Sequence, residues 1–78
     1  MTMTLEEFSA QFADAIEISH GDVSGMTEFK QLDIWDSLCV LTIIAMVDTN
    51  YNVTVGGNDL EKAVSVSDLF DLVRSRTK

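Results

Sequence analysis

Cysteine, histidine, proline and basic side chains are all scarce in this chain of 78 residues. It contains one cysteine, one histidine, no proline and five lysines and arginines. A single cysteine cannot form an internal disulfide, so the small cross-linked scaffolds of secreted proteins are excluded. The sequence also lacks a glycine-rich phosphate loop and the Cys/His spacing of a metal site. We therefore expect one domain over residues 1–78, with no metal site.

Acidic side chains outnumber basic ones by thirteen to five, which gives a net charge of −8. Three of the basic residues, Arg74, Arg76 and Lys78, lie in the last five positions, so the rest of the chain is more acidic still. Such a surface repels nucleic acid and anionic membranes, and either attracts basic partners or simply confers solubility. Nucleic acid is therefore not expected as a partner.

Apolar residues make up 46% of the chain, which indicates a folded domain because disordered chains combine high charge with low hydrophobicity. The longest apolar run is far shorter than the roughly 20 residues that span a bilayer, so no membrane span is expected. No basic-then-apolar signal segment opens the sequence, which favours a cytoplasmic location.

A first amphipathic helix is predicted to begin at Leu5. Thr4 and Glu7 have the spacing of a capping box, and the pattern stops near residues 19–21, where a glycine follows His20. The apolar residues recur at helical spacing: Leu5, Phe8, Phe12 and Ile16. Residues 20–35 show no sustained period and predict a long loop. Its scattered apolar residues are expected to pack over the core: Val23, Met26, Phe29, Leu32, Ile34 and Trp35.

A second helix is predicted from the apolar run Leu38–Val47 and its continuation to Tyr51, with Asp36 or Ser37 as the N-cap. We expect a buried face that holds Leu41, Ile44, Val47, Asp48 and Tyr51. The opposite face holds Cys39, Thr42, Ala45, Met46 and Thr49.

The remaining residues predict an extended loop over residues 51–55, a short third helix capped by Asn58, and a last helix. The last helix has the capping pattern of Ser65 and Asp68, and its apolar residues recur at helical spacing: Val66, Leu69, Phe70 and Val73. The fold class is therefore an all-α bundle of four helices, with a long loop between the first two helices and a short third helix.

Catalytic chemistry has little support in this sequence. His20 and Cys39 are each the only residue of their kind, so a Cys-His pair would depend on a single contact, and an idle or buried thiol is the commoner state of a cysteine. We expect no catalytic residues and no enzyme.

The informative site is the tripeptide Asp36-Ser37-Leu38, where the long loop meets the second helix. Alone, it would indicate ordinary helix capping. In its context it resembles the attachment site of acyl carrier proteins, whose Asp-Ser-Leu motif opens the second of four helices, and the resemblance extends from Leu5 to Val73. It implies that a phosphopantetheinyl transferase joins 4′-phosphopantetheine to Ser37 as a phosphodiester, which makes the chain a phosphoprotein whose arm carries acyl groups as thioesters.

The same resemblance implies roles for the neighbours of Ser37. Asp36 would lie near the transferase's metal-bound coenzyme or cap the helix, and Leu38 would begin the docking surface. The expected docking residues are Leu38, Cys39, Thr42, Ala45, Met46 and Thr49. The implied partners are the transferase and enzymes that load or use acyl groups, such as an acyl-activating ligase, a ketosynthase or an acyltransferase, and the implied state is a monomer.

The sequence departs from the family pattern at two places. Ile34 stands where the family often has glycine, so we expect a stiffer and more apolar loop before the motif. The expected docking face has few of the acids found in carriers of primary fatty acid synthesis. This less acidic face favours a stand-alone carrier of a dedicated pathway (polyketide, surface polysaccharide or modified lipid) over bulk fatty acid biosynthesis. The acyl chain could be sheltered by the aliphatic residues Leu41, Ile44, Val47, Leu69 and Val73, or these could be core contacts only.

Two alternatives remain at this point. One is an aminoacyl or peptidyl carrier, although such carriers typically have glycines before the serine, where this chain has Trp35 and Asp36. The other is a small acidic helical adaptor for a basic partner, in which Ser37 serves only as a helix cap.

Overall fold

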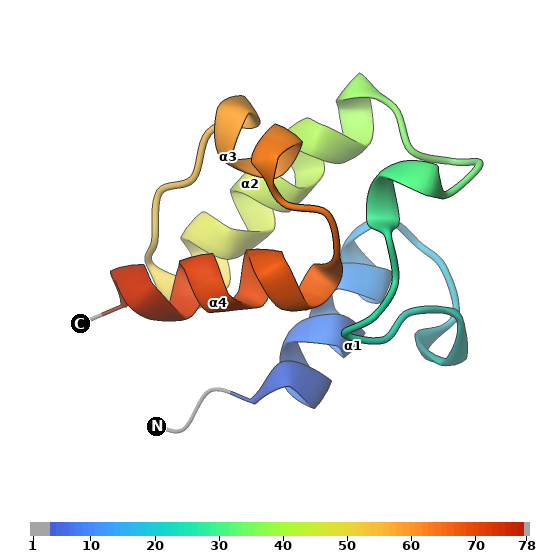
Figure 1. Cartoon of the computed structure of the whole chain (residues 1–78), viewed down its shortest axis with the longest axis horizontal. Helices are drawn as coiled ribbons and strands as arrows, with labels where there is room; N and C mark the ends of the chain where they lie inside the picture. The colour runs from blue at the N-terminus through green and yellow to red at the C-terminus, as the bar shows by residue number, and fades with distance from the viewer. Residues whose placement is uncertain (1–3, 78) are drawn as a thin grey trace.

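The computed structural model describes residues 4–77, so residues 1–3 and Lys78, the ends of the expected domain, lie outside it. Four α-helices follow one another along the chain, α1 (Leu5–Ala15), α2 (Ser37–Tyr51), α3 (Gly57–Lys62) and α4 (Val66–Arg76). Two single turns of 3₁₀-helix, η1 (His20–Asp22) and η2 (Phe29–Gln31), interrupt the long connection between α1 and α2. Over these described residues there is no strand, and the predicted all-α fold with its short third helix is confirmed (Figure 1).

The helices form a bundle in which α1 packs against both α2 and α4, and α3 packs against α2. Figure 1 shows α4 lying across the bundle, while the connection from α1 to α2 runs along the side opposite the C-terminus. This arrangement leaves the first turn of α2 at one end of the molecule, next to the end of the long connection.

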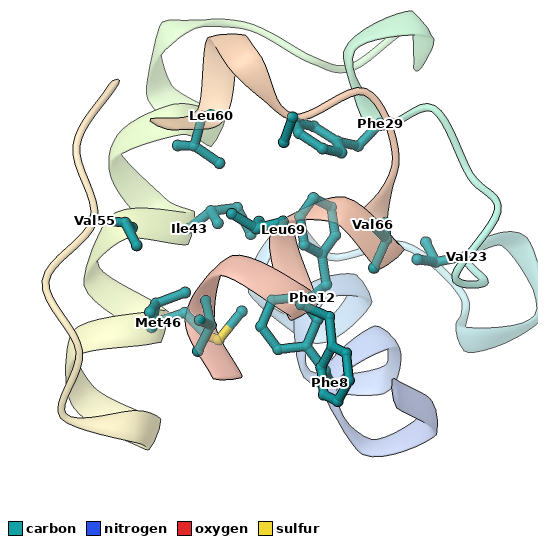
Figure 2. Close-up of a cluster of buried hydrophobic side chains, with 14 of the residues drawn as sticks. Phe8, Phe12, Val23, Phe29, Ile43, Met46, Val55, Leu60, Val66 and Leu69 are labelled. Carbon is teal, nitrogen blue, oxygen red and sulfur yellow. The ribbon is translucent and has the colours of Figure 1, made fainter. Parts of the chain in front are cut away.

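The core is built from apolar side chains of all four helices and of the connection (Figure 2). The largest fully buried side chains are Phe8, Phe12, Phe29, Ile43, Leu60, Leu69, Val47, Val66 and Val73. Phe8 and Phe70 meet with ring centroids 5.6 Å apart, and Phe12 and Phe29 with centroids 5.5 Å apart. Such pairs contribute about 0.5–1.5 kcal/mol beyond their buried area, which matters in a core this small.

Helix α1 begins as predicted and ends earlier. The Thr4 hydroxyl accepts a hydrogen bond from the Glu7 amide at 3.2 Å. The helix ends at Ala15 because Glu17 adopts a left-handed conformation (φ 61°), which lets the Ile18 amide donate to the carbonyl of Ala13 at 2.9 Å. Glutamate is an unusual residue for this position, so the sequence pattern placed the end near residues 19–21.

The buried face of α2 differs from the prediction. Met46 is only 9% exposed and packs into the core, whereas Leu41, expected on the buried face, is 64% exposed. Asp48 is also exposed. A helix that is apolar on almost every side gives no periodic signal for the direction of the core, so packing against α1 and α3 decides it.

The long connection is attached to the bundle at several points. Val23 and Phe29 are buried as expected, but Met26 is 88% exposed. The backbone of the connection also accepts hydrogen bonds from the first turn of α4: Val66 donates to Thr27 at 3.0 Å and Ser67 to Gly25 at 2.8 Å. A β-carbon on Gly25 would lie 2.5 Å from Cδ2 of Leu5, so glycine permits this close approach. Ile34, near the end of the connection, is exposed as well.

The N-cap of α3 is Gly56 and not Asn58, which lies inside the helix. The Gly56 amide donates to Oδ2 of Asp59 at 2.9 Å, so the carboxylate supplies the capping interaction. The capping box of α4 is confirmed: the Asp68 amide donates to the Ser65 hydroxyl at 3.3 Å, and the Ser65 amide donates to Oδ2 of Asp68 at 3.2 Å.

Replacement of Glu17 by glycine should stabilise the protein, because glycine adopts the left-handed conformation without the steric penalty that a β-carbon brings. We expect Glu17→Gly to raise the free energy of unfolding by about 0.5–1 kcal/mol, after the entropic cost of glycine is subtracted. Urea denaturation measures the change. Glu17→Ala is the control and should give no gain, and a neutral or destabilising glycine would contradict the interpretation.

The ion pair between Arg76 and Asp59 should make stability depend on acidity. The two guanidinium nitrogens donate to the two carboxylate oxygens at 2.9 and 3.2 Å, and these bonds, with the Gly56 amide, lower the pKa of Asp59. A lowered pKa stabilises the folded state above the unfolded value of about 3.9, and this contribution is lost as the pH falls through the folded value.

Arg76→Ala should therefore lower the melting temperature at pH 7, and the difference from the wild type should shrink toward pH 2. Melting curves across this range measure it. Arg74→Ala is the comparison, because the Arg74–Asp71 contact is longer (3.8 Å) and exposed, and it should leave the pH dependence unchanged. An equal loss at both pH values for Arg76→Ala would contradict the role of the carboxylate.

Candidate functional site

The start of α2 is fixed by Asp36. Its backbone is extended (φ −149°, ψ −174°), and its Oδ1 accepts a hydrogen bond from the Cys39 amide at 2.9 Å. That amide bond is the main cause of a lowered pKa for the Asp36 carboxyl, so the carboxylate is ionised at neutral pH. Of the two N-cap candidates in the sequence, the structure selects Asp36.

Ser37 is the first residue of α2 and is exposed. Its hydroxyl forms no hydrogen bond with any other residue between positions 4 and 77, so it is neither a cap nor part of a side-chain network. The interpretation of Ser37 as a helix cap is therefore wrong, because Asp36 has that role. What remains is a free primary hydroxyl at the positive end of a helix dipole, where an attached anion is stabilised.

The residues after Ser37 give α2 an exposed, mostly apolar side. Leu38 is 69% exposed and Leu41 64% exposed, and both lie within about one turn of the serine. Five exposed residues of this helix form what we call the open face of α2: Leu38, Leu41, Ala45, Asp48 and Thr49. Its only charged side chain is that of Asp48.

The predicted docking residues divide by burial. Leu38, Ala45 and Thr49 are exposed, and Thr42 is half-buried with its hydroxyl donating to the Leu38 carbonyl at 2.9 Å. Cys39 is half-buried, and its thiol donates to the Ile34 carbonyl at 3.2 Å. Met46 is buried, so its expected exposure is wrong. Leu41 was missed, although its position three residues after Leu38 is a signal for the same side of the helix.

The other reactive candidates have separate partners. Nε2 of His20 lies 2.6 Å from Oδ1 of Asp14 on the surface, while the Cys39 thiol is bonded to a backbone carbonyl, so the two do not form a Cys-His pair. Within residues 4–77 no group of three or more His, Cys, Asp or Glu residues is arranged to hold a metal ion. In the same part of the chain, every helix is too short or too polar to cross a membrane.

The division of roles between Asp36 and Ser37 can be tested by stability. Ser37→Ala should change the free energy of unfolding by less than about 0.5 kcal/mol, as is usual for exposed residues without partners. Asp36→Ala should be clearly destabilised at pH 7, because the Cys39 amide loses its acceptor. Urea denaturation measures both variants, and a larger loss for Ser37→Ala than for Asp36→Ala would contradict the assignment of the cap.

The fold was also compared with those of known proteins. No protein-family model and no curated protein matches the sequence. Among solved structures, the chain is similar to the solution NMR structure of a holo acyl carrier protein from Geobacter metallireducens. The two share 26% sequence identity and superpose with a TM-score of 0.76, over 94% of this chain and 84% of that one.

The match covers 94% of this chain, so it concerns the fold as a whole and not one helix pair. It points to a non-catalytic carrier and not to an enzyme. The structural match supports the resemblance to the acyl carrier protein family that the Asp-Ser-Leu motif suggested.

Proposed function

We propose that this chain is a stand-alone acyl carrier protein that carries acyl groups as thioesters on a 4′-phosphopantetheine arm attached to Ser37. The observation that carries the proposal is the exposed, unbonded hydroxyl of Ser37 at the first residue of α2. The whole-chain similarity to a carrier described as holo supports the same conclusion.

The residues around Ser37 fit such a group. Attachment forms a bond between the Ser37 oxygen and the phosphorus that bears the pantetheine in coenzyme A. The bond from that phosphorus to the bridging oxygen breaks, adenosine 3′,5′-bisphosphate leaves, and the hydroxyl proton passes to a base of the transferase. The product is an anion next to the first turn of α2, a helix of 15 residues, whose dipole stabilises negative charge at this end.

The chain's own contribution is to present the hydroxyl. Asp36 fixes the start of the helix by its bond to the Cys39 amide, so Ser37 is held in the first turn with its side chain free. Leu38, 69% exposed, offers an apolar contact directly beside it. When bound, the arm supplies the thiol that holds the acyl group.

The open face of α2 is the proposed docking surface for the transferase and for enzymes that load or use the acyl group, such as an acyl-activating ligase, a ketosynthase or an acyltransferase. Two exposed leucines and one carboxylate favour recognition by apolar contact over recognition by a basic patch. The acidic charge of the remaining surface steers the approach of basic partners. This composition supports a dedicated pathway (polyketide, surface polysaccharide or modified lipid) and a monomeric carrier.

The attachment is tested by incubation of the full chain with coenzyme A and a broad-specificity phosphopantetheinyl transferase, followed by intact mass measurement. The wild type should gain the mass of one phosphopantetheine group, and Ser37→Ala should gain none. Ser19→Ala is the matched control, because Ser19 is an exposed serine whose side chain makes no capping bond, and it should be modified like the wild type.

Absence of the adduct on the wild type, or its persistence in Ser37→Ala, would overturn the proposal. Loading of the modified protein with acyl-activating and aminoacyl-activating enzymes then separates an acyl carrier from an aminoacyl carrier. We expect transfer of acyl groups only.

A further inference from the structure

Trp35 lies two residues before Ser37 and belongs to an aromatic cluster. Its ring stacks on Phe12 of α1, with centroids 6.0 Å apart and an angle of 9° between the planes. It meets Phe29 of η2 edge-on, with centroids 5.0 Å apart. Phe12 and Phe29 are fully buried, so the half-buried indole connects the segment before the attachment site to the core.

This cluster borders the space between α2, α3 and the long connection. Figure 2 shows Phe29 and Leu60 at the same end of the core, next to α3. The cavity at this point has a volume of about 40 Å³. It is lined by Lys30, Trp35, Val40, Gly57, Leu60 and Glu61.

The cavity is too small for an aliphatic chain of several carbons. An apolar cavity that admits benzene, a molecule of six carbons, has a volume of about 150 Å³, nearly four times as large. The walls are also held together, because the Lys30 ammonium donates to the Glu61 carbonyl and joins the connection to the end of α3.

Most of the residues that the sequence suggested as an acyl lining are either fully packed or exposed. Val47, Leu69 and Val73 have no exposed surface and are packed within the core, while Leu41 points to solvent. Close-packed interiors resist the insertion of additional methylene groups, because neighbouring side chains must leave their preferred rotamers.

We propose that Trp35 closes the helical core of this carrier to acyl chains, so that the acyl group on the arm stays at the surface. The proposal rests on the proposed function of Ser37 as the attachment site. Since an exposed long aliphatic chain is unfavourable in water, the substrates that suit this carrier are short or polar acyl groups. Trp35 is then a specificity-determining residue, because an aliphatic chain can enter the core at the cavity beside α3 only if the indole leaves Phe12 and Phe29.

The test compares chain lengths on the full-length protein. The transferase is used with acetyl-, butyryl-, hexanoyl- and octanoyl-coenzyme A, and intact mass confirms each acyl carrier. Two readouts follow: the backbone amide chemical shifts of Val40 and Leu60, which line the cavity, and the rate of thioester hydrolysis. In the wild type we expect the same amide shifts for acetyl and octanoyl carriers, and hydrolysis rates within about twofold after correction with the matching free thioesters.

Trp35→Ala supplies the contrasting case. Removal of the indole opens space beside Phe12, Phe29 and Leu60, so the octanoyl group should shift the Leu60 amide and its hydrolysis should slow several-fold relative to the acetyl form. Met26→Ala is the control, because Met26 is exposed and does not line the cavity, and it should behave like the wild type.

The outcomes distinguish this proposal from the proposed function. If the wild type gains no adduct, the carrier function fails and this proposal with it. If the adduct forms and octanoyl shifts the Val40 and Leu60 amides of the wild type, only the closure of the core is overturned. If Trp35→Ala folds, as judged by circular dichroism, but shows no chain-length effect, Trp35 is not the barrier. If Trp35→Ala does not fold, the comparison of acetyl and octanoyl groups on the wild type alone tests whether the core is closed.

Discussion

The hydrogen bond from the Cys39 amide to the Asp36 carboxylate is the interaction on which the proposed site depends. It fixes where α2 begins, so Ser37 is the first helical residue and its hydroxyl is not needed to cap the helix. A serine one position earlier would be the cap itself, with its oxygen used by the backbone. The two neighbouring residues therefore have separate parts: the Asp36 carboxylate stabilises the start of the helix, and the Ser37 hydroxyl forms no hydrogen bond with the residues that the structure describes.

The local signals in the sequence predicted most of the fold. Caps and apolar periodicity depend on residues within one or two turns, so the starts of α1, α2 and α4 could be placed before the structure was known. The end of α1 could not, because Glu17 occupies a position where glycine is the usual signal. Asn58 was wrongly predicted as the cap of α3, because a helix could begin at any of several residues next to the two glycines. The hydrogen bond from the Gly56 amide to the Asp59 carboxylate makes Gly56 the N-cap.

The candidate site was predictable in part for the same reason. The Asp-Ser-Leu tripeptide singled out Ser37 as the candidate residue, and the structure adds that its hydroxyl forms no hydrogen bond within residues 4–77. The open face of α2 was predicted less well, since Met46 was expected to be exposed and is buried, whereas Leu41 was expected to be buried and is exposed. Both are large and apolar on a helix that is apolar nearly all round, and only the neighbours α1 and α3 distinguish them. Likewise, the stacking of Trp35 on Phe12 joins residues 23 positions apart, a contact that no local pattern contains.

The long connection between α1 and α2 has a consequence for chain entropy. Its middle is held to α4 by the bonds from Val66 to Thr27 and from Ser67 to Gly25, so it behaves as two short loops and not as one long one. Loop-closure entropy grows only slowly with length, so a few residues inserted on either side of this attachment would cost little. Loss of the attachment itself would merge the two loops, and the segment that precedes Ser37 would gain the conformational freedom of the whole connection.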